Sequence, residues 1–153
     1  MSRYPKPRKY TVKKKEKYIG DPNNVVMRSS WEVAFATWCE MNPSVIEWSS
    51  ETVVIPYRSP LDDLPHRYYV DFWAKIKDKT GNVTTYLIEI KPHVQCLPPD
   101  YSKRKRKPKQ ETIQEEVKTY AVNQAKWKCA NEFARRRGWR FKVLTEYELG
   151  LAK

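Results

Sequence analysis

Two acidic residues, Asp71 and Glu89, have a spacing that would bring their carboxylates together on a β-hairpin. Alternation of apolar and polar side chains predicts two strands, Arg67–Lys77 and Val83–Lys91. The segment Lys79–Gly81 between them is typical of a turn whose glycine takes the left-handed conformation. Residues at equal separations from the centre of this turn face each other, so Asp71 opposes Glu89 with Cβ atoms about 4.5–5.5 Å apart.

Lys91 would complete a hydrolytic site around these acids, because it projects from the same strand face as Glu89. Repulsion between the two carboxylates must be offset by a raised pKa, a basic partner or a cation. A divalent ion held by Asp71, Glu89 and the Ile90 carbonyl would polarise a phosphodiester and lower the pKa of an attacking water. Lys91 would position that water or offset charge in the transition state. The alternative is an ordinary set of cross-strand charges on a solvated sheet face.

Glu32 is a third acid with two competing interpretations. The segment Ser30–Met41 predicts a helix that ends before Pro43. Ser29, three residues before Glu32, makes a capping-box pattern that alone could explain the glutamate. However, Glu32 lies on the same side of the predicted helix as Phe35, where an acid would face the core or the sheet. A place at the site would offset the cost of that burial.

The other reactive residue types disfavour several kinds of site. The three cysteines, Cys39, Cys96 and Cys129, form no close pair and predict reduced thiols. Two histidines, His66 and His93, are too few to favour a zinc site or a Cys–His nucleophile. A metal would be held by carboxylates, which indicates a hard cation such as Mg²⁺.

The net charge of +12 is concentrated in two segments. Residues 3–17 contain eight Lys or Arg and residues 103–109 contain six, out of 30 in the chain. A nearly neutral body with two basic arms predicts binding of a polyanion, with added solubility as the alternative. We expect these arms to clamp a nucleic-acid backbone without reading its sequence. The residues that would do so are Arg8, Lys9, Lys13, Lys14, Lys15, Lys103, Arg104, Lys105, Arg106, Lys107 and Lys109.

The remaining patterns predict one α/β domain with helices packed on a mixed sheet. Its further elements are strands Val45–Trp48, Thr52–Tyr57 and Trp139–Leu144, a bent or divided helical stretch Glu111–Arg137, and a short helix Glu146–Leu151. We divide the chain into a flexible basic arm at residues 1–20 and a domain at residues 21–153 with a basic loop at 93–110. No segment is apolar and long enough to span a membrane.

Five motifs in this order resemble the PD-(D/E)XK nuclease superfamily, and within it the TnsA-like branch. The motifs are Arg28–Glu32, Tyr69–Phe72, Ile88–Pro92, Asn123–Trp127 and Gly138–Glu146. Within this branch the motifs are similar to those of the small head completion nucleases of tailed phages, and the likeness covers about residues 25–151. Val70 stands where the superfamily motif has its proline, which is often absent.

The resemblance implies a restriction-endonuclease-like fold, with a mixed sheet of four to five strands, and magnesium-dependent DNA cleavage. Asp71, Glu89 and Glu32 would hold Mg²⁺, for which Mn²⁺ is expected to substitute, and Lys91 would be the catalytic lysine. Gln124 or Lys126 would be a polar helper on the long helix. Gln124 could instead be the ordinary polar edge of that helix.

The resemblance also implies a role late in capsid assembly, in the host cytoplasm or retained in the virion. The expected partners are DNA and phage head or portal proteins, with a homodimer as one way to cut both strands. Two alternatives stay open. One is a non-catalytic DNA-binding protein of head assembly, which the intact Asp71, Glu89 and Lys91 disfavour. The other is a TnsA-like strand-cleaving subunit of a transposition system, which the short chain disfavours.

Overall fold

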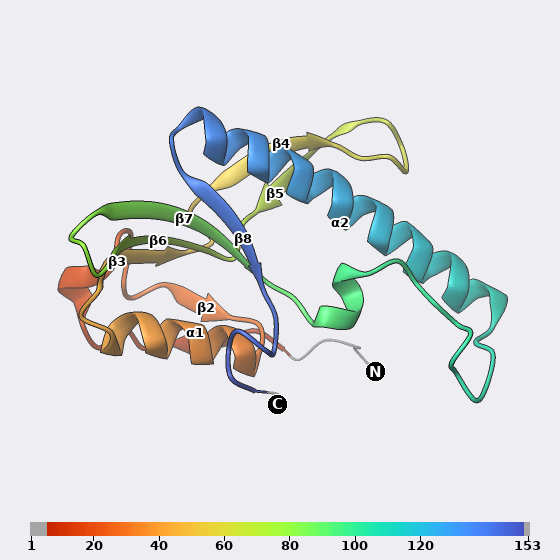
Figure 1. Ribbon diagram of the computed structural model, residues 1–153, viewed down its shortest axis with the longest axis horizontal. Helices are drawn as coiled ribbons and strands as arrows, with labels where there is room; N and C mark the ends of the chain where they lie inside the picture. The colour runs from red at the N-terminus through yellow and green to blue at the C-terminus, as the bar shows by residue number, and fades with distance from the viewer. Residues whose placement is uncertain (1–5, 152–153) are drawn as a thin grey trace.

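In the computed structural model, which describes residues 6–151, a four-stranded mixed sheet forms the centre of the molecule. Helix α1 (Ser30–Met41) covers one face of this sheet and helix α2 (Gln110–Arg136) the other (Figure 1). The predicted α/β domain with a mixed sheet between helices is thereby confirmed. In spatial order the strands are β3 (Val45–Ser50), β6 (Phe72–Lys77), β7 (Val83–Ile90) and β8 (Arg140–Leu144), of which β8 is parallel to β7 and the others are antiparallel.

The β6–β7 hairpin has the register that its turn predicts. Phe72 pairs with Ile88, and Gly81 has the expected positive φ, 90°. Both faces of β7 are buried: Leu87 packs in the core on the α2 side, and Ile88 in the core on the α1 side. Because helices cover both faces, a polar residue at the end of β7 is buried on either side.

The predicted strand Arg67–Lys77 is wrong as a single element, because the chain changes sheets in its middle. Its first part belongs to β5 (Pro65–Tyr69), which pairs with β4 (Val54–Arg58) in a separate two-stranded ribbon. Its second part is β6 of the central sheet. Tyr68 packs in the core on the α2 side, whereas Phe72 packs in the core on the α1 side.

A β-bulge lies where the two paired chains leave the central sheet for the ribbon. Ser50 pairs with Phe72, and the next strand pair is Val54 with Tyr69. Residues 51–53 therefore lie opposite residues 70 and 71, and the register shifts by one residue. The backbone is irregular at this point, and the predicted site residue Asp71 lies in it.

Residues 8–18 pack against the body, which differs from the mobile arm expected over residues 1–20. Strand β1 (Arg8–Tyr10) pairs with β2 (Val25–Met27), and a 3-10 turn, η1, covers Lys15–Lys17. Val12 and Tyr18 are buried in the core beside α1. Residues 1–5 of the expected arm lie outside the described residues.

A buried glutamate of α1 holds this N-terminal segment. Glu40 is 2% exposed, and its carboxylate accepts the backbone N–H groups of Lys13 and Lys14 at 2.7 and 2.9 Å and the Tyr10 hydroxyl. The Lys17 ammonium donates to backbone carbonyls at the C-terminal end of α1, where a cation is favoured. Part of the basic N-terminal segment therefore has a structural role.

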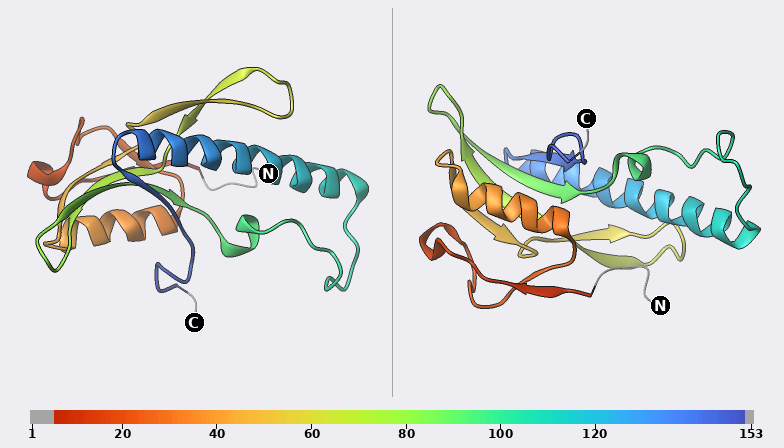
Figure 2. Two further views of the ribbon diagram at one scale, coloured as in Figure 1. Left: turned by 45° about the horizontal axis from the view of Figure 1, so that its top comes forward. Right: turned by 90° about the horizontal axis from the view of Figure 1, so that it is seen from below.

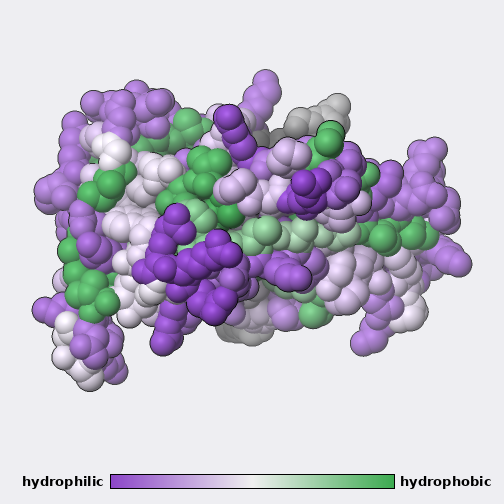
Figure 3. Space-filling view, turned by 90° about the horizontal axis from the view of Figure 1, so that it is seen from above, coloured by the Kyte–Doolittle hydropathy of each residue, from purple (hydrophilic) through white to green (hydrophobic). Residues whose placement is uncertain are grey.

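Helix α2 is one continuous helix of 27 residues, which settles whether the predicted stretch is divided. Its buried residues lie from its midpoint onwards and are Asn123, Trp127, Ala130 and Ala134. The first half projects from the body together with the 3-10 turn η2 (His93–Cys96) and the basic loop (Figures 1 and 2). The face over α2 is largely hydrophilic, with apolar residues interspersed (Figure 3).

The C-terminal end of α2 is closed by Gly138, as predicted. Gly138 has a φ of 71°, and its N–H and that of Trp139 donate to the carbonyls of Arg135 and Ala134 at 3.1 and 2.8 Å, which is a Schellman motif. The expected short helix Glu146–Leu151 is wrong, since these residues form turns. Across residues 6–151, neither helix is both long enough and apolar enough to cross a bilayer.

Candidate active site

Asp71 lies in the bulge between β5 and β6, next to the end of β7. Continuing the β6–β7 register by one residue places Asp71 opposite Glu89, as predicted. Its Oδ2 accepts the backbone N–H of Ile90 at 2.8 Å. Burial and the charge of Glu89 raise the pKa of Asp71 well above its ordinary value. The repulsion between Asp71 and Glu89 is therefore only partly offset by the Ile90 N–H and by the charge of Lys91.

Glu89 is fixed by two neighbours of different kinds. The side chain lies at the end of β7 and is 7% exposed. The Tyr68 hydroxyl donates to its Oε2 at 2.6 Å, and the Lys91 Nζ lies 3.8 Å from its Oε1. Burial raises the pKa of Glu89, against the effects of the Tyr68 hydrogen bond and of the Lys91 and Lys126 charges. The structure thus brings together Asp71, Glu89 and Lys91 as the sequence predicts.

Glu32 makes the capping contacts and also carries an unsatisfied oxygen. Its N–H donates to Ser29 Oγ at 3.1 Å, and Ser29 Oγ donates to Glu32 Oε2 at 3.1 Å. Glu32 Oε1 is buried with no hydrogen-bond partner among the described residues, and burial raises the pKa of this carboxyl. The charge of Glu32 is also felt at Asp71. Capping alone does not account for the buried oxygen.

Lys126 of α2 reaches the acids, whereas Gln124 does not. The Lys126 Nζ lies 5.5 Å from the centre of the Tyr68 ring, and the residue lines the same cleft as Asp71 and Glu89. Burial lowers the pKa of Lys126, and the charge of Glu89 raises it. Gln124 is exposed and is not among the residues that line this cleft. Of the two helper residues expected on the long helix, the structure therefore favours Lys126.

Tyr68 and Glu51 of the site carry no signal that the sequence could reveal, and Arg28 is marked in the sequence only as the first residue of the motif Arg28–Glu32. Tyr68 lies at a core position of a strand, and its hydrogen bond to Glu89 depends on the sheet change at the bulge. Arg28 and Glu51 are joined by an ion pair, with Arg28 Nε 2.8 Å from Glu51 Oε1. The Glu51 N–H donates to the Asp71 carbonyl at 3.1 Å. With Arg67 and Tyr69, these residues line a cleft of about 420 Å³.

The donor atoms of this cleft fit a hard divalent cation. Among residues 6–151, no three His, Cys, Asp or Glu side chains are close enough to form a complete metal-ligand cluster. What the structure offers is the pair Asp71 and Glu89, the orphaned Glu32 Oε1 nearby, and backbone carbonyls. All are oxygen donors, which suit Mg²⁺ or Mn²⁺. A cation would also relieve the repulsion that raises the pKa of Asp71.

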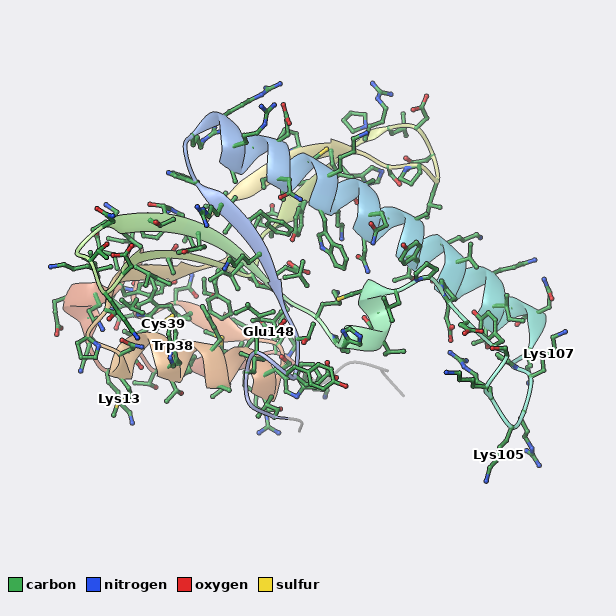
Figure 4. The ribbon with its side chains drawn as sticks, viewed as in Figure 1. Lys13, Trp38, Cys39, Lys105, Lys107 and Glu148 are labelled. Atoms are coloured by element: carbon green, nitrogen blue, oxygen red, sulfur yellow. The ribbon has the colours of Figure 1, made fainter. Side chains whose placement is uncertain are left out.

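The basic residues that the sequence singles out lie in three places. Arg8 and Lys9 line a hollow beside α1 that also includes Arg28. Lys13, Lys14 and Lys15 follow β1, and Lys13 lies below α1 (Figure 4). The loop residues Lys103, Arg104, Lys105, Arg106, Lys107 and Lys109 lie before α2, with Lys105 and Lys107 at the opposite end of the molecule from Lys13 (Figure 4).

Comparison with known proteins agrees with this geometry. Residues 42–146 match the family described as TnsA-like endonuclease N terminal, a range that includes Asp71, Glu89 and Lys91 but begins after Glu32. The head completion nuclease of Enterobacteria phage T4 is 38% identical over 138 residues, which cover 90% of this chain and 89% of that protein. No solved structure gives a significant match. The chain therefore belongs to the TnsA-like endonuclease family and is a DNA hydrolase homologous to a phage head completion nuclease.

Proposed function

We propose that this protein is a magnesium-dependent DNA endonuclease whose ion is held by Asp71 and Glu89, with Glu32, which the structure does not place in one ligand cluster with them, as the third ligand when the ion binds. The observation that carries the proposal is the pairing of the buried Glu89 with the half-buried Asp71 beside Lys91. Endonucleases of this family are typically metal-dependent, and the oxygen-only donor set favours Mg²⁺, with Mn²⁺ as a substitute. The bound ion would polarise the phosphodiester and lower the pKa of the attacking water.

The protein groups around the acids support this assignment. Asp71 uses Oδ2 to accept the Ile90 N–H, which leaves its Oδ1 for the ion. In a strand the N–H and C=O of one residue point to the same neighbour, so the Ile90 carbonyl also faces the Asp71 side and could add a ligand. The Tyr68 hydroxyl fixes one oxygen of Glu89. Lys91 and Lys126 would position the water or offset the negative charge that develops in the transition state.

The substrate would be bound through its phosphates. Arg8 and Lys9 beside the cleft, and the exposed loop residues 103–109, would contact the DNA backbone and confer little sequence preference. Lys13, Lys14 and Lys15 lie beyond β1 and would extend the same contact. Deletion of residues 1–17 is a poor test of this idea, because it would also remove β1 and the buried Val12.

The name of the T4 relative suggests a biological setting. By analogy with a head completion nuclease, we propose that the chain acts late in phage head assembly, on packaged DNA or its end, in the host cytoplasm or within the particle. Head or portal proteins would be its protein partners. A homodimer would supply two clefts for cutting both strands.

Cleavage of plasmid DNA in Mg²⁺, followed on agarose gels, tests the proposed site. Asp71→Ala and Lys91→Ala should abolish nicking and linearisation while DNA binding and folding are retained. Lys79→Ala, which removes an exposed lysine from the β6–β7 turn, is the control and should cut like the wild type. Equal cleavage by all the variants would reject this site. Binding without cleavage by the wild-type protein, in either Mg²⁺ or Mn²⁺, would favour a structural DNA-binding role.

A further inference from the structure

A second hollow adjoins the cleft that contains Asp71 and Glu89, and the charged side chains of its lining are all basic. Among the described residues, its lining contains the basic side chains of Lys6, Arg8, Lys9 and Arg28 and no acidic one. Arg28 also lines the cleft that contains Asp71 and Glu89. Arg28 is therefore shared by the hollow and the cleft. A polyanion bound in the basic hollow could extend past Arg28 to Asp71 and Glu89.

The guanidinium of Arg28 is held by a partner that a phosphate could replace. Arg28 Nε lies 2.8 Å from Glu51 Oε1, and the arginine side chain is 56% exposed whereas that of Glu51 is 25% exposed. An exposed ion pair of this kind contributes little to stability. A guanidinium also binds the tetrahedral phosphate oxygens through two parallel N–H groups, as it does a carboxylate. The exchange of Glu51 for a phosphate therefore keeps the same type of bond.

The backbone of Glu51 has a conformation that is unfavourable for local stability. Glu51 has a φ of 56°, a left-handed conformation that costs energy in a residue with a side chain. It lies in the β-bulge, and its N–H donates to the carbonyl of Asp71. Bulges next to sites commonly aim a side chain, and this one aims a carboxylate at Arg28 on the rim of the cleft.

We propose that Arg28 binds the DNA phosphate next to the one that is cut, and that Glu51 occupies Arg28 until DNA arrives. One strand would run through the basic hollow of Lys6, Arg8 and Lys9 and would then pass Arg28 into the cleft that contains Asp71 and Glu89. Arg67, on the same cleft, would receive the strand on the other side. This inference rests on the proposed function, because it places the cut at Asp71 and Glu89.

The two halves of the ion pair should then have opposite effects on DNA binding. Arg28→Gln removes the phosphate contact and should weaken binding about 10-fold, the loss expected for one charged hydrogen-bonded contact. The slope of log affinity against log salt concentration should also be less steep for Arg28→Gln, by about 0.7–0.9, than for the protein that keeps Arg28. Glu51→Gln removes the competing carboxylate and should tighten binding several-fold at the same salt.

The measurement is fluorescence anisotropy of a labelled DNA duplex across a salt series, in an Asp71→Asn background so that no DNA is cut. Arg135→Gln and Glu132→Gln are the matched controls, because Arg135 and Glu132 form an exposed ion pair at 2.7 Å on α2 and neither residue lines the cleft or the basic hollow. Each control should change the affinity for DNA less than two-fold. The two controls should not reproduce the pattern expected for the Arg28–Glu51 pair, in which the arginine variant binds more weakly and the glutamate variant more tightly. Circular dichroism confirms that each variant is folded.

Three outcomes overturn the inference. They are unchanged affinity and slope for Arg28→Gln, unchanged or weaker binding for Glu51→Gln, and an Arg135→Gln effect as large as that of Arg28→Gln. If Arg28→Gln does not fold, Glu51→Gln decides alone, since only a gain in affinity agrees with the proposal. The proposed function fails separately, if Asp71→Asn cuts DNA as the wild type does.

Discussion

Replacement of Asp71 by Asn should make the metal-free protein more stable while abolishing cleavage. Asn keeps a side-chain oxygen that can accept the Ile90 N–H and removes one of two adjacent negative charges. Two unit charges about 5 Å apart interact by about 3 kcal/mol at an effective dielectric constant of 20. Lys91 and Lys126 offset part of this repulsion. We therefore expect a gain of about 1–2 kcal/mol in the free energy of unfolding, or about 2–8 °C in Tm for a chain of this size.

The gain should depend on pH in a defined direction. Burial and Glu89 raise the pKa of Asp71 in the folded protein, whereas in the unfolded chain it stays near 3.9. Below that value Asp71 is protonated in both states and carries no penalty. As pH rises through the folded pKa, the wild type loses stability and Asp71→Asn does not. The difference between them should be larger at pH 7.5 than at pH 4.5.

Thermal and urea unfolding, followed by circular dichroism at both pH values in EDTA, measures this difference. Asp78→Asn is the control, because hydrogen bonds from Thr80 and other groups of the turn lower the pKa of Asp78, so its charge is favourable and its loss should not stabilise. Mg²⁺ at ten times its Kd should add about 1.4 kcal/mol to the wild type and nothing to Asp71→Asn. A variant no more stable than the wild type at pH 7.5 in EDTA would refute the repulsion between Asp71 and Glu89.

Two further substitutions examine the groups that support the site. Glu40→Gln should cost about 1–3 kcal/mol in urea unfolding at neutral pH. Burial would raise the pKa of Glu40, but hydrogen bonds from Tyr10 and the N–H groups of Lys14 and Lys13 lower it. The stability that Glu40 contributes is therefore present above its ordinary pKa and is lost as pH falls. The difference in free energy of unfolding between the wild type and Glu40→Gln should shrink on acidification, and a difference that grew would contradict this assignment. Tyr68→Phe should raise the Mg²⁺ concentration for half-maximal cleavage about 10-fold, with less change in the rate at saturating Mg²⁺, and an unchanged metal requirement would show that Glu89 is held without Tyr68.

Local patterns were sufficient to predict the parts of the fold and site that depend on local geometry. The β6–β7 register follows from strand alternation and from the left-handed glycine of a short turn, so the pairing of Asp71 with Glu89 could be predicted. Helix α1 and its cap at Ser29 likewise follow from neighbouring residues. The position of Lys91 beside Glu89 could be predicted because residues two apart in a strand lie on the same face.

Tertiary structure decides the parts that the sequence does not reveal. Alternation continues through Asp71, so the pattern contains no sign that Val70 and Phe72 pack in different cores. The N-terminal segment has the composition of a mobile arm, yet one buried carboxylate, Glu40, fixes it by accepting its backbone N–H groups. A glutamate on a helix gives no indication of a partner 26 residues earlier in the chain, such as Lys14.

The β-bulge explains why the acids, the tyrosine and the Arg28–Glu51 pair meet at one point. A regular strand from Arg67 to Lys77 would keep Tyr68 and Phe72 on one face, but the change of sheet directs Tyr68 towards Glu89 and α2. The same irregularity places Glu51 at a positive φ with its N–H on the Asp71 carbonyl. Regularising the bulge, for example by deleting Thr52, should therefore separate Tyr68 from Glu89 and Glu51 from Arg28 together. This one backbone feature therefore positions the two carboxylates, the Tyr68 hydroxyl and the Arg28–Glu51 pair. No single side chain could position all of these groups.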